Sequence, residues 1–196
     1  ISKEPGAGKI DTSGVALRNG DFAKGELAEV ATQSRVDLAV SEMVAIGKAQ
    51  GRKSWLVFAC GIEHAAQIME QLQLHGITHA GIFGNTHKEQ RRNRIIDFQD
   101  GKIQCLVNCD VLTTGFDAPA TDLVALMRPT ESTSLYVQMV GRGLRTSPGK
   151  ENAIVLDYGG NVRRHGPIDA VMPKMTGRGN EVSKVKECGE CGLLIA

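Results

Sequence analysis

Two arginines with the spacing of a helical turn are the first candidates for chemistry in this chain. Arg142 and Arg145 close the segment 138–145, and Gly141 directly precedes the first of them. Helical spacing places both guanidinium groups on one side of a turn, where their planar forks of donors suit phosphate oxygens. One arginine on a transferring phosphoryl group can contribute roughly 10³ to 10⁵ in rate. Two solvated arginines after a helix are the plainer interpretation, and the segment alone does not decide between them.

Residues that could contact a nucleotide or a nucleic acid gather in the segment 113–119. They are Thr113, Thr114, Gly115 and Asp117. A hydroxyl can donate to a phosphate, a glycine lets backbone approach closely, and a carboxylate fixed by a nearby proline can accept from a sugar hydroxyl. A capped turn, whose side chains bond only their own backbone, explains the segment equally simply. Its position about twenty residues before 138–145 makes the two segments together more specific than either alone.

The elements that must position these residues follow from the apolar pattern. Short continuous apolar runs predict strands at 54–59, 79–83, 103–107, 123–126 and 153–156. Helical spacing predicts helices at 25–50, 62–75, 86–99 and 132–140. A capping box of Thr86 and Glu89 is expected to open the third helix, and Gly101 to end it. We therefore expect an α/β fold with a mostly parallel sheet of about five to six strands, helices on both faces, and ligands at the carboxyl ends of the strands.

The two ends of the chain depart from this pattern. Residues 1–22 are expected to form an irregular or edge segment, leading into a lobe at 23–170 and a weakly packed tail at 171–196. Although 5–10 resemble a phosphate-binding loop, they lack its first glycine and its final hydroxyl. The tail carries two cysteines, Cys188 and Cys191, with the spacing of half a zinc ribbon. Zinc needs four ligands, so either a second pair follows the chain or the thiols are idle, and we expect no bound metal here.

The composition restricts the class of protein. Hydrophobic residues make up 41% of the chain, aromatic residues 4%, and the formal net charge is +1, which fits an α/β interior and argues against a polycation. No apolar run reaches the roughly 20 residues of a membrane-spanning helix. Because the chain begins at Ile1, we expect a piece of a longer protein, and we expect this piece to be monomeric. The N-terminus has neither a basic start nor an apolar signal core, so we expect a cytoplasmic, bacterial nucleoid-associated protein with Cys60, Cys105 and Cys109 as reduced core thiols.

Together, these segments resemble the C-terminal RecA-like lobe of the superfamily 2 helicases and translocases. The fifth and sixth motifs of that lobe read much like Thr-Gly-Phe-Asp-Ala-Pro at 114–119 and Gln-x-x-Gly-Arg-x-x-Arg at 138–145. Residues 55–65 resemble its fourth motif, and 84–91 resemble the segment that follows. The resemblance covers about 52–160 and implies a RecA-like fold.

Within this superfamily the chain is most similar to the RadD family of bacterial DNA-repair helicases. The similarity lies in 11–14, 157–162 and 165–169. The chain departs from the DEAD-box branch, which has a threonine where Cys109 stands and a His-Arg pair where Gln138-Met139 stands. This difference favours single-stranded or branched DNA over RNA as the partner.

The resemblance implies a role for each matching residue. Arg145 would act as the arginine finger on the γ-phosphate of ATP, Arg142 would assist it, and Gln138 would couple that site to the interface between two lobes. Asp117 would accept a hydrogen bond from the ribose, and Gly115 would allow close approach. Both arginines are therefore expected to face the carboxyl edge of the sheet, close to Asp117. The residues that would contact nucleic-acid phosphates are Thr113, Thr114, Gly84 and Arg91.

The chain has no Walker loop and no acidic motif to hold ATP and Mg²⁺. Motor ATPases carry both on the first lobe. We therefore expect full activity to need an N-terminal RecA-like lobe, on the same polypeptide or in trans, the isolated chain to be inactive, and Zn²⁺ to bind only in a longer protein. Two alternatives stay open: the motor lobe of a type I or type III restriction enzyme, and a nucleic-acid-binding module that uses no nucleotide.

Overall fold

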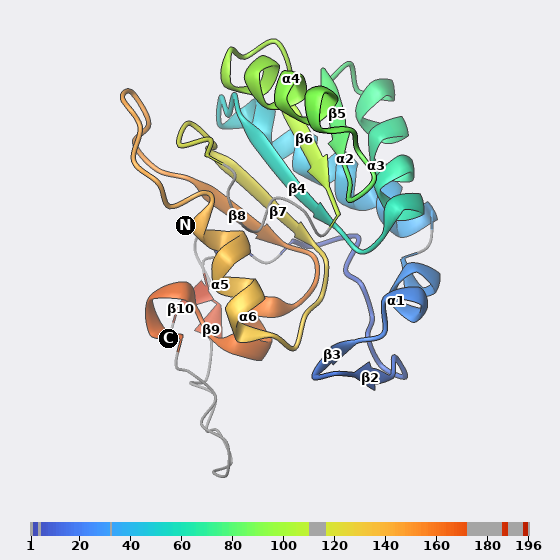
Figure 1. Ribbon diagram of the computed structural model, residues 1–196. Helices are drawn as coiled ribbons and strands as arrows, with labels where there is room; N and C mark the ends of the chain where they lie inside the picture. The colour runs from blue at the N-terminus through green and yellow to red at the C-terminus, as the bar shows by residue number, and fades with distance from the viewer. Residues whose placement is uncertain are drawn as a thin grey trace.

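One parallel sheet organises the computed structural model, which describes residues 2–3, 5–31, 33–109, 117–171, 186–187 and 194–195 (Figure 1). In spatial order its strands are β1 (Ser2–Lys3), β8 (Ile154–Asp157), β7 (Leu123–Met127), β4 (Trp55–Ala59), β6 (Cys105–Asn108) and β5 (His79–Ile82). Every neighbouring pair in this sheet is parallel. The α/β fold and the number of strands expected from the sequence are confirmed.

Helices cover both faces of the sheet (Figure 1). They are α2 (Gln33–Ala49) and α3 (Ile62–Leu74) on one face, and α4 (Lys88–Gln99) and α5 (Thr133–Gly141) on the other. In the central strand β4, Trp55 and Val57 belong to the first core, whereas Leu56 and Phe58 belong to the second. Because alternate residues of a strand point to opposite faces, a strand between two helical layers is apolar throughout. This burial explains the continuous apolar runs in the sequence.

The prediction of one continuous helix at 25–50 is wrong. The structure has two helices there, α1 (Lys24–Val30) and α2. Leu27 of α1 packs with Phe22 and Cys60 in a small separate cluster, whereas the buried residues of α2 pack on the sheet. The apolar periodicity continues from α1 into α2 because both helices have a buried side. The buried side of α1 packs on the small cluster with Phe22 and Cys60, whereas that of α2 packs on the sheet.

The capping box expected from Thr86 and Glu89 is also absent. Helix α4 begins at Lys88, and its N-cap His87 makes no side-chain capping bond. Thr86 instead closes a turn with Phe83: its Oγ1 accepts from the Phe83 amide at 2.8 Å, and its own amide donates to the Phe83 carbonyl at 3.1 Å. The hydroxyl therefore holds the loop that contains Gly84 rather than the helix end. The predicted stop at Gly101 is confirmed, since α4 ends at Gln99 and Gly101 has a φ of 75°.

The lead-in segment lies against the carboxyl ends of β7 and β8. It contains the edge strand β1 and a hairpin of β2 (Leu17–Arg18) and β3 (Asp21–Phe22). The Ile10 amide donates to the Tyr158 carbonyl at 2.9 Å, and the Asp21 carboxylate accepts from the Thr130 hydroxyl at 3.0 Å. Residues 1–22 were expected to form an irregular or edge segment, and the pairing of β1 with β8 fits that expectation. The contacts show in addition that this segment covers part of the sheet edge where ligands were expected.

Beyond β8 the chain forms α6 (Asn161–His165), the 3₁₀ turn η1 (Ile168–Ala170) and an antiparallel pair, β9 (Lys186–Glu187) and β10 (Leu194–Ile195). Cys188 and Cys191 lie outside the described residues. The three cysteines expected in the core, Cys60, Cys105 and Cys109, are buried thiols outside any disulfide. Among the residues that the structure describes, no helix is long and apolar enough to cross a membrane.

Candidate functional site at the amino edge of the sheet

The arginine pair lies at the edge of the sheet where the strands begin. Helix α5 starts after β7, with the Ser132 hydroxyl accepting from the Leu135 amide at 3.3 Å, and runs back along the sheet to Gly141. The residues that follow α5 lead to β8, whose first amide, that of Ile154, donates to the Asp122 carbonyl just before β7 at 3.0 Å. The expectation that these arginines face the carboxyl edge is therefore wrong, because the helix that carries them runs antiparallel to the strands.

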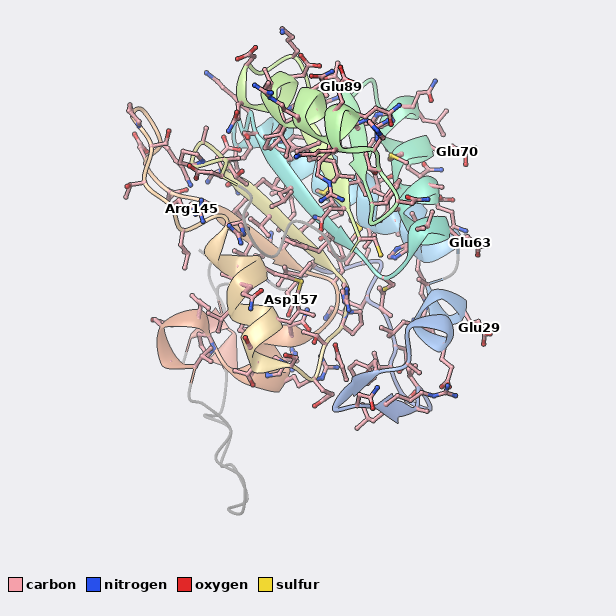
Figure 2. All side chains as sticks on the ribbon, in the orientation of Figure 1. Glu29, Glu63, Glu70, Glu89, Arg145 and Asp157 are labelled. Atoms are coloured by element: carbon pink, nitrogen blue, oxygen red, sulfur yellow. The ribbon has the colours of Figure 1, made fainter. Side chains whose placement is uncertain are left out.

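Arg145 and Asp117 are in direct contact at this amino edge. Nη1 of Arg145 donates to Oδ1 of Asp117 and forms an ion pair with it, and the side chains are 40% and 75% exposed. The backbone carbonyl of Asp117 also accepts from Nε2 of Gln99 at the end of α4, at 2.5 Å. Arg145 extends from the segment beyond α5 (Figure 2). Two residues that the sequence assigns to one nucleotide site thus meet on an accessible surface.

Arg142 has a different environment from Arg145. Only 8% of its surface is exposed, and it caps the end of α5, with its amide donating to the Met139 carbonyl at 3.3 Å. Burial lowers the pKa of Arg142, the positive charge of Arg145 lowers it further, and Asp117 opposes both effects. An arginine nevertheless stays charged in a protein. The pair therefore consists of one packed and one exposed cation that influence each other electrostatically.

The turn between the two arginines depends on a glycine. A Cβ at Gly143 would lie 2.8 Å from Cγ2 of Val124 and 3.3 Å from Cβ of Ala153. The absence of a side chain lets the turn pack directly on β7 and on the residue before β8. Sequence reasoning did not single out Gly143, because the need for it arises from strands far away in the chain.

Lys150 connects the two segments of the site and was also missed. Its Nζ donates to the carbonyls of Gly143 at 2.8 Å, Arg145 at 2.7 Å and Pro119 at 3.0 Å. Two of these carbonyls belong to the arginine segment, and the third lies two residues after Asp117. No local sequence signal identifies a lysine that binds carbonyls from two distant segments.

The Gln138 side chain forms a hydrogen bond within its own helix. Its Nε2 donates to the Ser134 hydroxyl one turn earlier in α5, at 3.2 Å. Together with Val137, Ile168 and Val171 it lines a shallow, mainly apolar depression beside α5. The structure thus places Gln138 on the outer side of the helix that leads to Arg142.

Two of the predicted nucleic-acid contacts, Gly84 and Arg91, lie at the opposite, carboxyl edge. Gly84 follows β5, and a Cβ there would meet nothing within 4 Å. Nη2 of Arg91 donates to the Phe83 carbonyl at 3.1 Å, which ties α4 to the same loop. Thr113, Thr114 and Gly115 lie outside the described residues, between Cys109 after β6 and Asp117 before β7. Within the described residues, no group of three or more His, Cys, Asp or Glu side chains could hold a metal ion.

Comparison with known proteins decides the family to which this site belongs. Residues 36–147 match the model of the helicase conserved C-terminal domain. The chain belongs to this helicase family. The match begins in α2 and ends just after Arg145, so this helicase domain includes both predicted site edges.

Several known proteins are similar to this helicase domain. A putative mitochondrial ATP-dependent helicase, irc3 of Schizosaccharomyces pombe, is 37% identical over 116 residues, which is 59% of this chain and 19% of that protein. The putative ATP-dependent helicase IRC3 of Saccharomyces cerevisiae is 30% identical over 151 residues, 76% of this chain and 22% of its own length. A 51.5 kDa protein of a Lactococcus phage is 28% identical over 194 residues, 94% of this chain and 42% of that protein. The chain thus spans less than half the length of these relatives.

Solved structures support the fold. The E. coli DEAD-box protein SrmB, solved with the regulator of ribonuclease activity A, matches with a TM-score of 0.56 at 18% identity, over 72% of this chain and 91% of that chain. The C-terminal part of the Fun30 ATPase domain matches with a TM-score of 0.53 at 14% identity, over 61% of this chain and 40% of that chain. At these identities the similarity shows the RecA-like fold alone, and the expected fold class is confirmed.

Proposed function

We propose that this helicase domain is the C-terminal motor lobe of an ATP-dependent DNA helicase or translocase of the RadD type, acting in DNA repair or recombination. The contact between Arg145 and Asp117 carries the proposal. It brings together, on an accessible edge, a phosphate-binding cation and a sugar-binding carboxylate that are 28 residues apart in the chain. Membership of the helicase family supplies the reason to interpret this pair as a nucleotide site.

The proposed mechanism is an exchange of partners. Without nucleotide, Asp117 holds the Arg145 guanidinium at the edge of the lobe. When ATP bound to an N-terminal RecA-like lobe reaches this edge, the guanidinium moves to the γ-phosphate and the carboxylate accepts from a ribose hydroxyl. Arg142 contributes positive charge from its buried position, and Gly115 gives the nucleotide room. Arginine suits this step because its donor fork matches the charge that spreads over the phosphoryl oxygens.

The first lobe supplies what this chain lacks. It would hold Mg²⁺ and the β- and γ-phosphates, as the Walker loop and acidic motif do in motor ATPases. This chain alone is therefore proposed to be inactive. We also propose that it is monomeric and cytoplasmic. In a longer protein, Cys188 and Cys191 would supply two of the four ligands of a Zn²⁺ site, because thiolates at this spacing suit tetrahedral zinc.

The carboxyl edge is proposed to hold DNA while the amino edge serves ATP. Gly84 would contact the phosphate backbone, and Arg91 would add positive charge beside it. Thr113 and Thr114 would provide further phosphate contacts. Such contacts position a strand without reading its bases. Gln138, on α5, would couple ATP binding at the amino edge to closure of the interface between the two lobes. Placing the two ligands on different edges allows ATP-driven closure to move the lobe along a bound strand.

Replacing Arg145 with alanine in the protein that contains both lobes tests this function. We expect DNA-stimulated ATP hydrolysis to fall by roughly 10³ to 10⁵, the contribution of an arginine finger. DNA binding and folding should be retained, because an exposed ion pair contributes only about 0 to 1 kcal/mol. Arg18→Ala is the matched control, since Arg18 is 75% exposed and pairs with Glu26 at 3.7 Å. Wild-type hydrolysis by Arg145→Ala would reject the motor assignment.

The same assays distinguish the remaining alternatives from the proposed function. A nucleic-acid-binding module would bind DNA without any effect of the Arg145 substitution on hydrolysis. A restriction-enzyme motor would lose hydrolysis, but its parent protein would also cleave DNA. Steady-state ATP hydrolysis by this lobe alone would contradict the proposed need for a first lobe.

A further inference from the structure

Lys150 occupies an unusual position between the two segments of the proposed site. It lies half-buried after a tight turn in which its amide donates to the Ser147 carbonyl at 3.1 Å and Gly149 has a φ of 76°. This turn directs the lysine back toward the segment that carries Arg145. Its ammonium group then donates to three backbone carbonyls at 2.7 to 3.0 Å.

An ammonium group has three N–H donors and no acceptor. The three carbonyl contacts of Lys150 therefore use all of its donors, so that none is left for a phosphate oxygen. Because the ammonium is charged, each of these bonds is stronger than one between neutral groups. Two of these contacts, with Pro119 and Gly143, are part-buried, whereas the contact with Arg145 is exposed.

The origin of the three carbonyls determines what Lys150 can do. Gly143 and Arg145 belong to the turn after α5, and Pro119 lies two residues after Asp117. The Lys150 ammonium thus joins the backbone of the arginine segment, at Gly143 and Arg145, to the backbone at Pro119, next to Asp117. By contrast, the ion pair between Arg145 and Asp117 is exposed and contributes little stability.

We propose that Lys150 is a positioning residue, which fixes the Arg145 guanidinium relative to Asp117 and to an incoming nucleotide without touching the nucleotide itself. This inference rests on the proposed function. Its physical basis is that an arginine accelerates phosphoryl transfer only when it is held in the correct place, and a misplacement of about 1 Å can cost on the order of 10² in rate.

The test uses the two-lobe protein with Lys150→Met, which keeps an unbranched side chain of similar length and removes its donors. We expect kcat for DNA-stimulated ATP hydrolysis to fall roughly tenfold or more, whereas KM for ATP changes much less. Lys53→Met is the matched control, because Lys53 is an exposed lysine that lines a depression at the same edge together with Lys150. It should keep the wild-type kcat.

Lys150→Arg is the second variant, and it keeps the charge. Its planar fork cannot direct three donors from one nitrogen toward three carbonyls, so we expect kcat to fall here as well. This variant carries the test if Lys150→Met does not fold, which a thermal melt of each protein determines.

A double variant identifies the residue through which Lys150 acts. In the Arg145→Ala background, measured by single turnover with enzyme in excess, replacing Lys150 should cause no further loss, because residues that act as one unit are not additive. Losses that multiply, a rise in KM at constant kcat, or wild-type kcat in both Lys150 variants would each overturn the proposal. If Arg145→Ala itself keeps full activity, the proposed function fails instead.

Discussion

Gly47 of α2 lies directly against the ring of Trp55 in β4, and a Cβ at Gly47 would be only 2.4 Å from Cζ2 of that ring. Trp55 is fully buried, so its ring has no solvent to move into. We expect Gly47→Ala to lower the free energy of unfolding by about 1–3 kcal/mol through overpacking. Urea denaturation measures this loss.

Gly25 provides the matched control for Gly47, because it is also a helical glycine. A Cβ at Gly25 in α1 would meet nothing within 4 Å. There, alanine should stabilise the fold by about 0.5–1 kcal/mol through helix propensity and a more restricted unfolded chain. Equal effects at the two positions would show that the contact with Trp55 does not limit the packing of α2.

Gly143→Ala should displace the turn that carries the arginines. The new methyl group would lie 2.8 Å from Cγ2 of Val124, which is buried in β7. We expect a loss of about 1–3 kcal/mol in the free energy of unfolding. Val124→Ala leaves a cavity when made alone, but in combination with Gly143→Ala it opens the space that the methyl group needs. The double variant should therefore lose less than the sum of the single losses in chemical denaturation; additive losses would contradict this packing.

Asp21 should stabilise the attachment of the lead-in segment. Its carboxylate accepts from the Glu131 amide at 2.7 Å and from the buried Thr130 hydroxyl at 3.0 Å. Removing the acceptors by Asp21→Ala leaves these donors unsatisfied and should cost about 1–3 kcal/mol of unfolding free energy. Hydrogen exchange of the Glu131 amide should accelerate in parallel.

Asp100→Ala is the comparison for Asp21, because the Asp100 carboxylate pairs with Lys102 at 3.2 Å on the surface. This change should cost no more than about 0.5 kcal/mol. If the two variants were equally stable, the hairpin would not be held by its carboxylate.

His64 should make stability depend on pH. The residue is 3% exposed, its Nδ1 accepts from the Cys60 amide at 3.2 Å, and burial lowers its pKa to about 4. The unfolded chain has an ordinary histidine pKa of about 6.5. Between these values only the unfolded state binds the proton. Stability is therefore complete above about pH 6.5 and falls as the pH drops toward 4, by up to about 1.4 kcal/mol per pH unit.

Denaturation curves between pH 4 and pH 7 test this dependence. His64→Asn keeps an acceptor for the Cys60 amide but does not titrate, so the slope should become flatter than that of the wild type. An unchanged slope in His64→Asn would exclude His64 as its source.

The sequence by itself determined strands β4 to β8, the alternation of these strands with helices, and the resemblance to helicases. These features are local: a strand buried on both faces is a continuous apolar run, as in 55–59, and a motif keeps its spacing whatever the rest of the chain does. The same reasoning failed where two local interpretations competed. Thr86 has the spacing of a capping residue, yet its hydroxyl bonds Phe83 in the preceding turn.

Only the tertiary structure decided which edge of the sheet carries the arginines and which of them is exposed. The edge follows from the direction of α5 against the strands, and the burial of Arg142 follows from packing around the end of that helix. The contacts of Arg145 with Asp117, and of Lys150 with Pro119, join segments that spacing along the chain cannot relate. A sequence fixes which groups are available, but the distances between them depend on how helices and strands pack.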